Sequence, residues 1–412
     1  MFREILIYLS AYIGLFAVIF YTLSAFTRKK VKKYVVDEKN PPFISIIIPA
    51  FNEEKGIAAT IKSALSAEYP KNKMEVIVVD DGSVDKTYQI AKKFRSKIVK
   101  VFTKPNKGKG HALNYGIKRA KGEIIFTMDA DSIIKPDSVK HQVARFANPQ
   151  VMCVSPIVAV YNPKGILRRV QQVEYFMGVF LREAFASLNA VHVTPGAFSA
   201  YRASFFKKHK GFDENNLTED FEMALRIQSH DYIIENSLKS VVYAKSPKKF
   251  KELLIQRKRW YIGLIRNLIE YKRLFSKNHG ALGLIVLPIA VSTIIISVFL
   301  TLYLAIKTML DLRKELMLLD SINFDFLNSI EFSRYAFERF WFSIISDPMM
   351  LFFILFGLII AGYMIFAKSK VKEHAGVKLS VPLFLVFYAF LFAFWWTLAF
   401  IYHFFDKNVK WR

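Results

Sequence analysis

The amino-acid sequence predicts an α/β domain with a mostly parallel sheet, joined to an α-helical membrane region of about four spans with interfacial helices. Three observations lead to this fold class. Long apolar stretches lie at the start and in the last third of the chain, and the polar block between them alternates buried strands with amphipathic helices. The composition combines 53% hydrophobic residues with a formal net charge of +25, which suits a membrane protein with a basic cytoplasmic face.

Four apolar stretches reach the length of about 20 residues that a helix needs to cross a bilayer. They cover residues 5–26, 281–306, 349–367 and 381–404. The first lacks a small-residue cleavage signature, and its positive charges follow the apolar run. We therefore expect it to be a retained anchor rather than a signal peptide.

The distribution of Lys and Arg predicts the orientation of these spans. Basic clusters at residues 27–33, 256–259 and 368–372 fall on one side if the N-terminus is outside and residues 34–280 are cytoplasmic. The basic tail, residues 406–412, disagrees with this arrangement, but three junctions outweigh one short tail. The sequence thus predicts a multi-pass protein of the cell membrane.

Four segments follow from these boundaries. We expect an N-terminal transmembrane helix with a basic flank over residues 1–33, a cytoplasmic domain over 34–247, interfacial helices over 248–280 and a C-terminal transmembrane region over 281–412. The single cysteine, Cys153, excludes an intrachain disulfide and the usual multi-cysteine zinc site. The sequence contains no compact basic-aromatic module, so the positive charge does not indicate a nucleic-acid partner.

The cytoplasmic block opens with a strand and helix alternation that predicts βαβ winding and parallel strands. Residues 44–49 form a near-continuous apolar run, as expected of a strand buried on both faces. Residues 74–81 and 97–103 repeat this pattern, and residues 123–131 form a fourth strand that ends in acids. In such sheets the ligand lies beyond the carboxyl ends of the strands.

Acidic residues gather at these strand ends. The Asp80-Asp81-Gly82-Ser83 segment alone is as consistent with a turn as with a site. Asp129 and Asp131 are harder to dismiss, because carboxylates at i and i+2 point to the same side and repel each other unless a cation lies between them. Hard oxygen ligands suit Mg²⁺ or Mn²⁺, which keep positions open for a diphosphate.

Two further segments carry polar groups whose role the local pattern leaves open. Residues 106–114, NKGKGHALN, form a glycine-containing loop in which Lys107 and Lys109 can approach a phosphate or a sugar. Residues 217–227, LTEDFEMALRI, have the pattern of a helix start, with Thr218 as the N-cap and acids near the positive end of the dipole. By itself this second pattern does not distinguish a structural acid from a catalytic one.

The segments AFNEE, DDGSVDKT, NKGKGHALN, DAD, TED and QRKRW occur in this order within residues 44–262, and together they resemble the family 2 glycosyltransferases. More narrowly, the chain is similar to the membrane-embedded processive β-glycan synthases, which make cellulose, chitin, hyaluronan or poly-N-acetylglucosamine. The resemblance implies a GT-A, Rossmann-like nucleotide-sugar-binding domain that transfers a sugar from a UDP-sugar with inversion.

The resemblance also implies a role for each matching residue. Asp80 and Asp81 would hold the uracil and ribose of the donor. Asp129 and Asp131 would hold the ribose and the Mg²⁺ or Mn²⁺ that bridges the diphosphate, and Asp220 would be the general base. The remaining donor-binding residues would be Asn52, Glu53 and Lys109. The acceptor and the leaving diphosphate would contact Gly196, Glu219, Gln256, Arg259 and Trp260.

The QRKRW segment has a second interpretation. Taken alone, it is a basic amphipathic stretch lying on anionic headgroups, and Arg257 and Lys258 are expected to keep that role. Four spans are few for a channel, so either interfacial helices near residues 248–275 and 328–346 or a small membrane partner subunit would complete it.

The first expectation for function is a processive transferase that extends a β-linked glycan, with UDP-N-acetylglucosamine as the first donor to test, and exports it through the membrane. The alternative is a transferase that adds one sugar to a lipid acceptor, either a polyprenyl phosphate or a glycerolipid or ceramide. A non-catalytic membrane scaffold is the remote third possibility.

Overall fold

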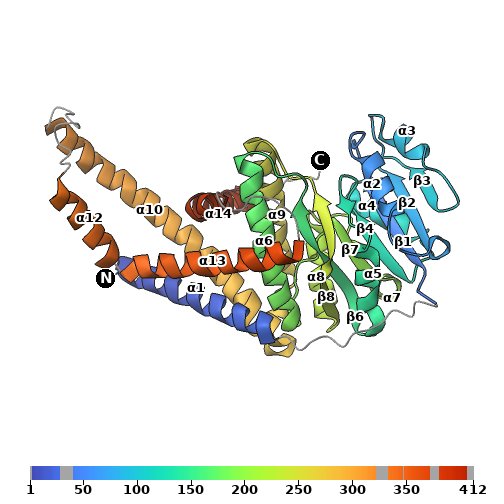
Figure 1. Ribbon diagram of the computed structural model, residues 1–412, viewed down its shortest axis with the longest axis horizontal. Helices are drawn as coiled ribbons and strands as arrows, with labels where there is room; N and C mark the ends of the chain where they lie inside the picture. Colours follow the sequence, from blue (N-terminus) through green and yellow to red (C-terminus); the bar gives the residue numbers. More distant parts are fainter. Residues whose placement is uncertain (1, 28–39, 322–332, 347, 372–379, 406–412) are drawn as a thin grey trace.

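The computed structural model describes residues 2–27, 40–321, 333–346, 348–371 and 380–405. An α/β domain forms one end of the molecule, and long helices extend from it to the other end (Figure 1). The expected basic flank at 28–33, the tail at 406–412 and the start of the segment expected at 328–346 lie outside the described residues.

Eight strands form one sheet, in the order β3-β2-β1-β4-β7-β6-β8-β5. Their bounds in chain order are Ile44–Ala50 (β1), Met74–Asp80 (β2), Val99–Thr103 (β3), Ile124–Met128 (β4), Ile133–Ile134 (β5), Val151–Val160 (β6), Phe198–Arg202 (β7) and Ile233–Ala244 (β8). The strands β1 to β4 are mutually parallel, as the alternation of strands and helices predicts.

The rest of the sheet adds antiparallel strands to the mostly parallel arrangement that the sequence predicts: β6 and β8 pair in parallel, but the sheet as a whole is mixed. Strand β7 runs antiparallel to both β4 and β6, and β5 runs antiparallel to β8. The alternation in the sequence stops near residue 131, and the later strands are not joined to β4 by a βαβ crossover. Instead β7 enters beside β4 from the opposite direction, which brings later parts of the chain to the carboxyl edge of the first strands.

Helices cover both faces of the sheet. Side chains of β1 alternate between two cores: Ile46 and Ile48 belong to one, and Ile47 to the other. This alternation is the period of two that an extended strand imposes. The helices of the α/β domain are Ile57–Leu65 (α2), Thr87–Lys92 (α3), Lys109–Ile117 (α4), Ser138–Val143 (α5), Ala203–His209 (α7) and Glu219–Ser229 (α8). Short 3₁₀ turns cover Lys71–Lys73, Ala144–Ala147, Lys272–Leu274 and Lys277–His279, and a π-helical turn covers Leu282–Val286.

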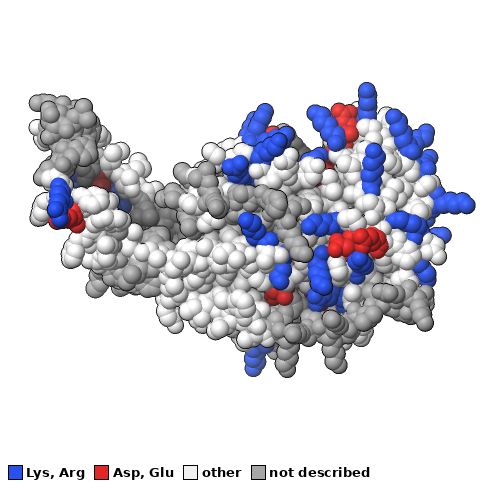
Figure 2. All heavy atoms as spheres, viewed as in Figure 1, with Lys and Arg blue, Asp and Glu red and all other residues white. Residues whose placement is uncertain are grey.

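The helical region consists of α1 (Phe2–Thr27), α6 (Ile166–Ser187), α9 (Phe250–Glu270), α10 (Leu287–Ser321), α12 (Arg334–Ser346), α13 (Pro348–Val371) and α14 (Ser380–Phe405). Helix α6 is central because it packs on β6 of the sheet and also on α1, α13 and α14. On the face shown in Figure 2, Lys and Arg side chains gather over the α/β domain, whereas the described surface of the adjoining helices is mostly uncharged.

Among the described residues, two helices are long and apolar enough to cross a membrane: Tyr8–Thr27 and Leu282–Leu312. The stretches expected to form the third and fourth spans are helical, as α13 and α14, but the described part of α14 contributes only a shorter apolar segment, Leu391–Tyr402. The expected four spans are therefore not established by length and composition.

Candidate active site

The polar segments that follow β1, β2 and β4 lie at one edge of the sheet. These strands are parallel neighbours, and Ala50 at the end of β1 pairs with Asp80 at the end of β2. Asp129 follows directly after β4. The structure thus brings these polar strand ends together where a ligand binds in an α/β sheet.

Asp81 fixes the loop that follows β3. Its carboxylate accepts hydrogen bonds from the backbone N–H groups of Lys107 (3.1 Å) and Gly108 (2.8 Å), and it forms a buried ion pair with Lys104. The neighbouring Asp80 accepts a hydrogen bond from Thr103 Oγ1 at 2.8 Å through Oδ2. Its Oδ1 is buried and has no hydrogen-bond partner among the described residues, so it is a free acceptor.

Asn52 connects the loop that follows β1 to the loop that follows β2. Its side-chain oxygen accepts a hydrogen bond from the Val84 N–H at 3.0 Å, and its own N–H donates to Ser83 Oγ at 3.0 Å. Asn52 has a φ of 54°, a conformation that asparagine tolerates better than most residues. Next to it, burial raises the pKa of Glu53, and Lys245 partly opposes this from 3.8 Å.

Gly196 lies where the segment that follows β4 meets the segment that precedes β7. Met128 pairs with Phe198 in the antiparallel ladder, and the Asp129 N–H donates to the Ala197 carbonyl at 3.3 Å. A Cβ on Gly196 would lie 2.8 Å from Lys109 Nζ, 3.2 Å from Asp220 Oδ2 and 3.8 Å from Asp129 Oδ1. The three charged groups therefore converge on a backbone that has no side chain.

Lys109 joins two of the acids. Its Nζ lies 2.8 Å from Asp129 Oδ1 and 2.9 Å from Glu219 Oε1. Burial alone would lower the pKa of Lys109, but the carboxylates of Asp129, Glu219 and Asp220 outweigh it and raise the pKa above its usual range. The ammonium group is therefore charged at neutral pH.

Asp220 has the setting of a proton acceptor. Its Oδ2 accepts a hydrogen bond from the Gly196 N–H at 3.0 Å, and its Oδ1 accepts one from the Phe221 N–H at 2.8 Å. Burial and then the Glu219 carboxylate raise its pKa to about 6, while Lys109 lowers it. Asp220 is thus ionised at pH 7, yet it holds a proton more readily than an ordinary carboxylate.

Asp131 lies beside other acids at the same edge. Burial, followed by the carboxylates of Asp129 and Glu53, raises its pKa to about 7. No group of three or more His, Cys, Asp or Glu residues in the described ranges is placed to hold a metal ion alone. The oxygen donors nevertheless fit Mg²⁺ or Mn²⁺, which bind through one or two carboxylates together with substrate phosphates, and a bound cation would relieve the repulsion.

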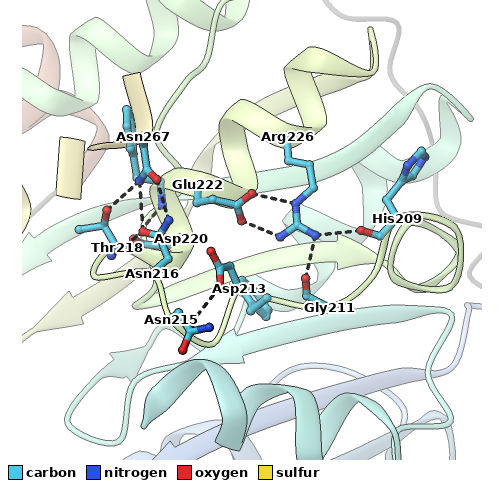
Figure 3. A network of polar contacts seen from close by, with 12 residues as sticks. His209, Gly211, Asp213, Asn215, Asn216, Thr218, Asp220, Glu222, Arg226 and Asn267 are labelled. Carbon is cyan, nitrogen blue, oxygen red and sulfur yellow. Dashed lines mark hydrogen bonds and ion pairs between the residues drawn. The ribbon is translucent and has the colours of Figure 1, made fainter. Parts of the chain in front are cut away.

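The N-terminus of α8 is held against α9. Thr218 occupies the N-cap position, as the sequence predicts, but its hydroxyl caps no helix N–H group; it accepts a hydrogen bond from Asn267 Nδ2 at 3.0 Å. Asn267 also contacts Asn216, whose Nδ2 donates to Asn267 Oδ1 at 2.7 Å (Figure 3). A Cβ on Gly263 would lie only 2.6 Å from Thr218 Cγ2, so the two helices touch closely here.

The same helix α8 is anchored one turn later. Arg226 forms two hydrogen bonds with the Glu222 carboxylate, of 3.0 and 2.6 Å, and donates to the carbonyls of His209 and Gly211 at 2.8 Å (Figure 3). The Tyr271 hydroxyl donates to Glu222 as well. Asp220 therefore lies on a helix whose first two turns are fixed on both sides.

The QRKRW residues of α9 lie at different places. Arg259 is close enough to Asp220 for its charge to lower the pKa of that acid, and Gln256 Oε1 is buried without a hydrogen-bond partner in the described ranges. The expectation that Arg257 lies on lipid headgroups is wrong: Arg257 is 3% exposed and pairs with Glu174 at 2.6 Å. Lys258 has its Nζ 3.4 Å from the centre of the Tyr402 ring.

Three charged residues that pair with predicted site residues or with the QRKRW segment are not predicted from the sequence: Lys104, Lys245 and Glu174. Lys104 and Glu174 pair with acids or arginines far away in the chain, and no local pattern signals such pairs. Lys245 follows β8, whose end lies near Glu53 only because the later strands complete the sheet. The apolar pattern of β8 is the sequence signal that could have identified Lys245, because this lysine directly follows the end of that strand.

Comparison with known proteins gives the class of this fold. The structure is similar to that of the mannosyltransferase PcManGT from Pyrobaculum calidifontis, solved in complex with GDP-Man and Mn²⁺. The similarity covers 99% of this chain and 100% of that one, with a TM-score of 0.60 and 18% sequence identity. The mixed sheet with its helices is thus the GT-A fold of glycosyltransferases. Residues 45–210 match the family model of glycosyl transferase family 2, so the chain contains a domain of this family.

Two curated relatives are similar over part of the chain. The poly-β-1,6-N-acetyl-D-glucosamine synthase of Staphylococcus epidermidis is 30% identical over 224 residues, 53% of this chain and 54% of the relative. The β-monoglucosyldiacylglycerol synthase of Nostoc sp. is 28% identical over 243 residues, 58% of this chain and 52% of the relative. The chain thus spans about half the length of the curated relatives that it matches.

Proposed function

We propose that the protein transfers a sugar from a nucleoside-diphosphate sugar to an acceptor hydroxyl, with inversion at the anomeric carbon. The observation that carries this proposal is the convergence of Asp220, Lys109 and Asp129 on the backbone of Gly196. An ionised carboxylate with a raised pKa, a fixed ammonium and a strand-end acid then border one space that a Cβ would fill.

The reaction needs a base on one side of the anomeric carbon and positive charge on the other. The acceptor oxygen attacks the anomeric carbon, the bond from that carbon to the phosphate oxygen breaks, and the diphosphate leaves with its electron pair. Asp220 takes the proton of the acceptor hydroxyl. Its pKa of about 6 suits this role, because a base works best when its pKa is near the operating pH. Lys109 orients Asp129 and Glu219 through its two ion pairs. Arg259 would supply positive charge to the leaving diphosphate.

The donor is assigned to the carboxyl edge of β1, β2 and β4. The Oδ1 of Asp80, which has no hydrogen-bond partner among the described residues, would accept a hydrogen bond from the base or the ribose. Asn52 and Glu53 would border the same nucleotide, and Asp81 holds the loop that leads to Lys109. Asp129 and Asp131 would hold Mg²⁺ or Mn²⁺ together with the diphosphate. The ion, when bound, neutralises charge on the leaving diphosphate. UDP-N-acetylglucosamine is the first donor to test, since the Staphylococcus epidermidis relative is a poly-β-1,6-N-acetyl-D-glucosamine synthase.

For the acceptor, we propose first the end of a growing β-linked glycan, extended processively and passed across the membrane. Gln256, Arg259 and Trp260 of α9, with Gly196 and Glu219, would border this acceptor. A tryptophan face suits a pyranose ring, because sugar rings expose C–H groups that pack on aromatic faces. The similarity to a polymer-forming relative supports this choice.

The second candidate is transfer of a single sugar to a lipid acceptor. The Nostoc relative, named a β-monoglucosyldiacylglycerol synthase, favours it, since its similarity covers 58% of this chain. Size separation of the product distinguishes the two functions. Membranes that contain the protein are incubated with radiolabelled UDP-N-acetylglucosamine, or with other UDP-sugars, and Mn²⁺. Label in high-molecular-mass glycan supports processive synthesis; label confined to chloroform-extractable lipid supports the second candidate.

A matched pair of variants ties the activity to the site. Asp220→Asn is expected to abolish transfer while leaving UDP binding close to normal. Asp231→Asn is the control, because Asp231 lies in the same domain with its side chain 79% exposed. Transfer retained in Asp220→Asn would disprove its role as base.

We also propose that α1, α10, α13 and α14 all cross the cell membrane, with the N-terminus outside and the α/β domain in the cytoplasm; a small partner subunit would complete a channel. Two of these helices have the required length and composition in the described residues. Because Cys153 is the sole cysteine, Cys153→Ala provides a background for single-cysteine labelling of intact cells. Val84→Cys, 90% exposed, should resist an impermeant maleimide, and Tyr335→Cys, 68% exposed, should react. The reverse pattern would invert the proposed topology.

A further inference from the structure

A buried ion pair contacts the tryptophan that we place at the acceptor. Arg257 of α9 has its Nη2 2.6 Å from Glu174 Oε2 of α6, with the two side chains 4% and 20% exposed. One helical turn further along α9 lies Trp260, and the Arg257 guanidinium carbon is 4.4 Å from the centre of its indole ring. A single guanidinium therefore contacts both a carboxylate of a neighbouring helix and the Trp260 ring.

Helix α14 joins the same cluster. The Tyr388 hydroxyl lies close to Glu174 and to Tyr261, the residue after Trp260. The Tyr261 ring stacks on Trp396 of α14, with ring centres 4.4 Å apart. The cluster thus connects α6, α9 and α14, and α6 is the helix that packs on the sheet.

Trp260 lies between this cluster and a second fixed point on α9. The second point is the contact of Gly263 with Thr218, two residues before Asp220 in the chain. With α9 held at residues 257 and 263, neither rotation nor sliding of the helix is free. The distance from the Trp260 ring to Asp220 is therefore set by the two contacts together.

We propose that Arg257, oriented by Glu174, is a positioning residue that holds the Trp260 ring for the acceptor sugar. This inference rests on the proposed function, in which Trp260 contacts the acceptor. Arginine suits the position because its planar guanidinium stacks on an aromatic face while its N–H fork binds a carboxylate, and lysine reproduces neither contact fully. Burying an ion pair costs desolvation free energy, and two apolar side chains at these positions would pack without that cost. They would not, however, hold the indole ring in a defined orientation.

The first test measures the position of the ring and needs no turnover. For each protein, the emission of Trp260 is obtained as the difference between that protein and the same protein with Trp260→Phe. Arg257→Gln and Glu174→Gln are expected to increase acrylamide quenching of this difference emission. Lys258→Gln, which removes the neighbouring cation of the same helix, is the control and should leave the quenching as in the wild type. Unchanged quenching in both Arg257→Gln and Glu174→Gln would overturn the proposal.

The second test measures transfer, with UDP-N-acetylglucosamine as donor and a β-1,6-linked N-acetylglucosamine tetramer as acceptor probe. Arg257→Gln is expected to raise the acceptor KM by about tenfold while the donor KM stays within about twofold, since a cation–π contact has roughly this worth. An equal rise in the acceptor KM and the donor KM, together with a lowered melting temperature, would mean that the Arg257–Glu174 pair is only structural. If Arg257→Gln does not fold, Arg257→Lys keeps the charge and should show a smaller acceptor effect. Wild-type protein that transfers no sugar from any nucleoside-diphosphate sugar, to glycan or to lipid, would refute the proposed function, while the quenching result would still decide whether Arg257 positions the Trp260 ring.

Discussion

Gly263 of α9 lies directly against Thr218 at the start of α8, with only 2.6 Å between the position of a Cβ on Gly263 and Thr218 Cγ2. This contact joins the two segments that carry the proposed base and the proposed acceptor residues. The side chain of Asn267, one turn after Gly263, adds a hydrogen bond to the Thr218 hydroxyl at 3.0 Å. The relative position of Asp220 and α9 therefore depends on a glycine that has no catalytic group.

The first prediction concerns this contact. Gly263→Ala should push α9 away from α8, at a cost of roughly 1–3 kcal/mol in the free energy of unfolding, because overpacked sites relax incompletely. Transfer should fall more than donor binding, which calorimetry with UDP can measure. Gly362→Ala is the control, since nothing lies within 4 Å of a Cβ there. Equal effects of the two substitutions would show that the contact is not tight.

The second prediction is the pH dependence of transfer. Asp220 must be ionised to accept a proton, and its pKa is about 6, so kcat should fall about tenfold per pH unit below pH 6. The measurement uses saturating Mn²⁺ and donor, with UDP binding followed over the same pH range to separate binding from turnover. An acidic limb with a midpoint near that of an ordinary aspartate would contradict the effect of burial.

The third prediction links Asp131, metal and stability. The pKa of Asp131 is about 7 in the folded protein and lower in the unfolded chain, so the folded state binds more protons between these values. Stability without metal should therefore fall as pH rises from about 4 to 7. Asp131→Asn removes this charge and should raise the melting temperature at pH 8 in EDTA. Mn²⁺ with UDP should raise the melting temperature of the wild type but not that of Asp131→Asn; a metal-induced rise of equal size in both would exclude Asp131 as a ligand.

The fourth prediction compares two ion pairs of the same sequence spacing. Arg226→Met leaves the Glu222 carboxylate buried without its cation, with only the Tyr271 hydroxyl as a donor, and should cost about 3–5 kcal/mol in the free energy of unfolding. Arg334→Met breaks the pair with Glu338, in which the Arg334 and Glu338 side chains are 92% and 60% exposed, and should cost about 0–1 kcal/mol. Denaturant unfolding measures both changes. Similar values would mean that the Glu222 site readily admits water.

The first half of the α/β domain is predictable from the sequence because its information is local. The apolar runs before Asp80 and Asp129 have the length of buried strands, and acids stand at their ends. The antiparallel entry of β7 is not predictable in this way, since a pattern of alternating apolar residues does not encode which strand lies beside it. The sequence therefore predicts a mostly parallel sheet but not its antiparallel strands, β5 and β7.

For the candidate site, the resemblance names residues from distant segments, and the structure brings Asp129, Gly196 and Asp220 within reach of one another. Their chemical roles remain predictions. Pairs between distant residues are beyond local patterns: Asp81 with Lys104 and Glu174 with Arg257 follow from packing alone. From the sequence, the basic residues 257–259 are therefore expected to form one charged surface, but Arg257 is buried inside the protein.

The antiparallel pairing of β4 with β7 also bears on how new specificities can arise. The proposed donor residues, such as Asp80 and Lys109, precede Met128, and the proposed acceptor-side residues, such as Asp220 and Trp260, follow Phe198. The two parts meet through the backbone pairing of β4 with β7. Main-chain hydrogen bonds tolerate changes of side chain on either strand. A recombinant chain that keeps this ladder and leaves Gly196 without a side chain can thus exchange its acceptor half and retain its donor half. With the proposed residue roles, the ladder would be a crossover point at which donor and acceptor preferences separate.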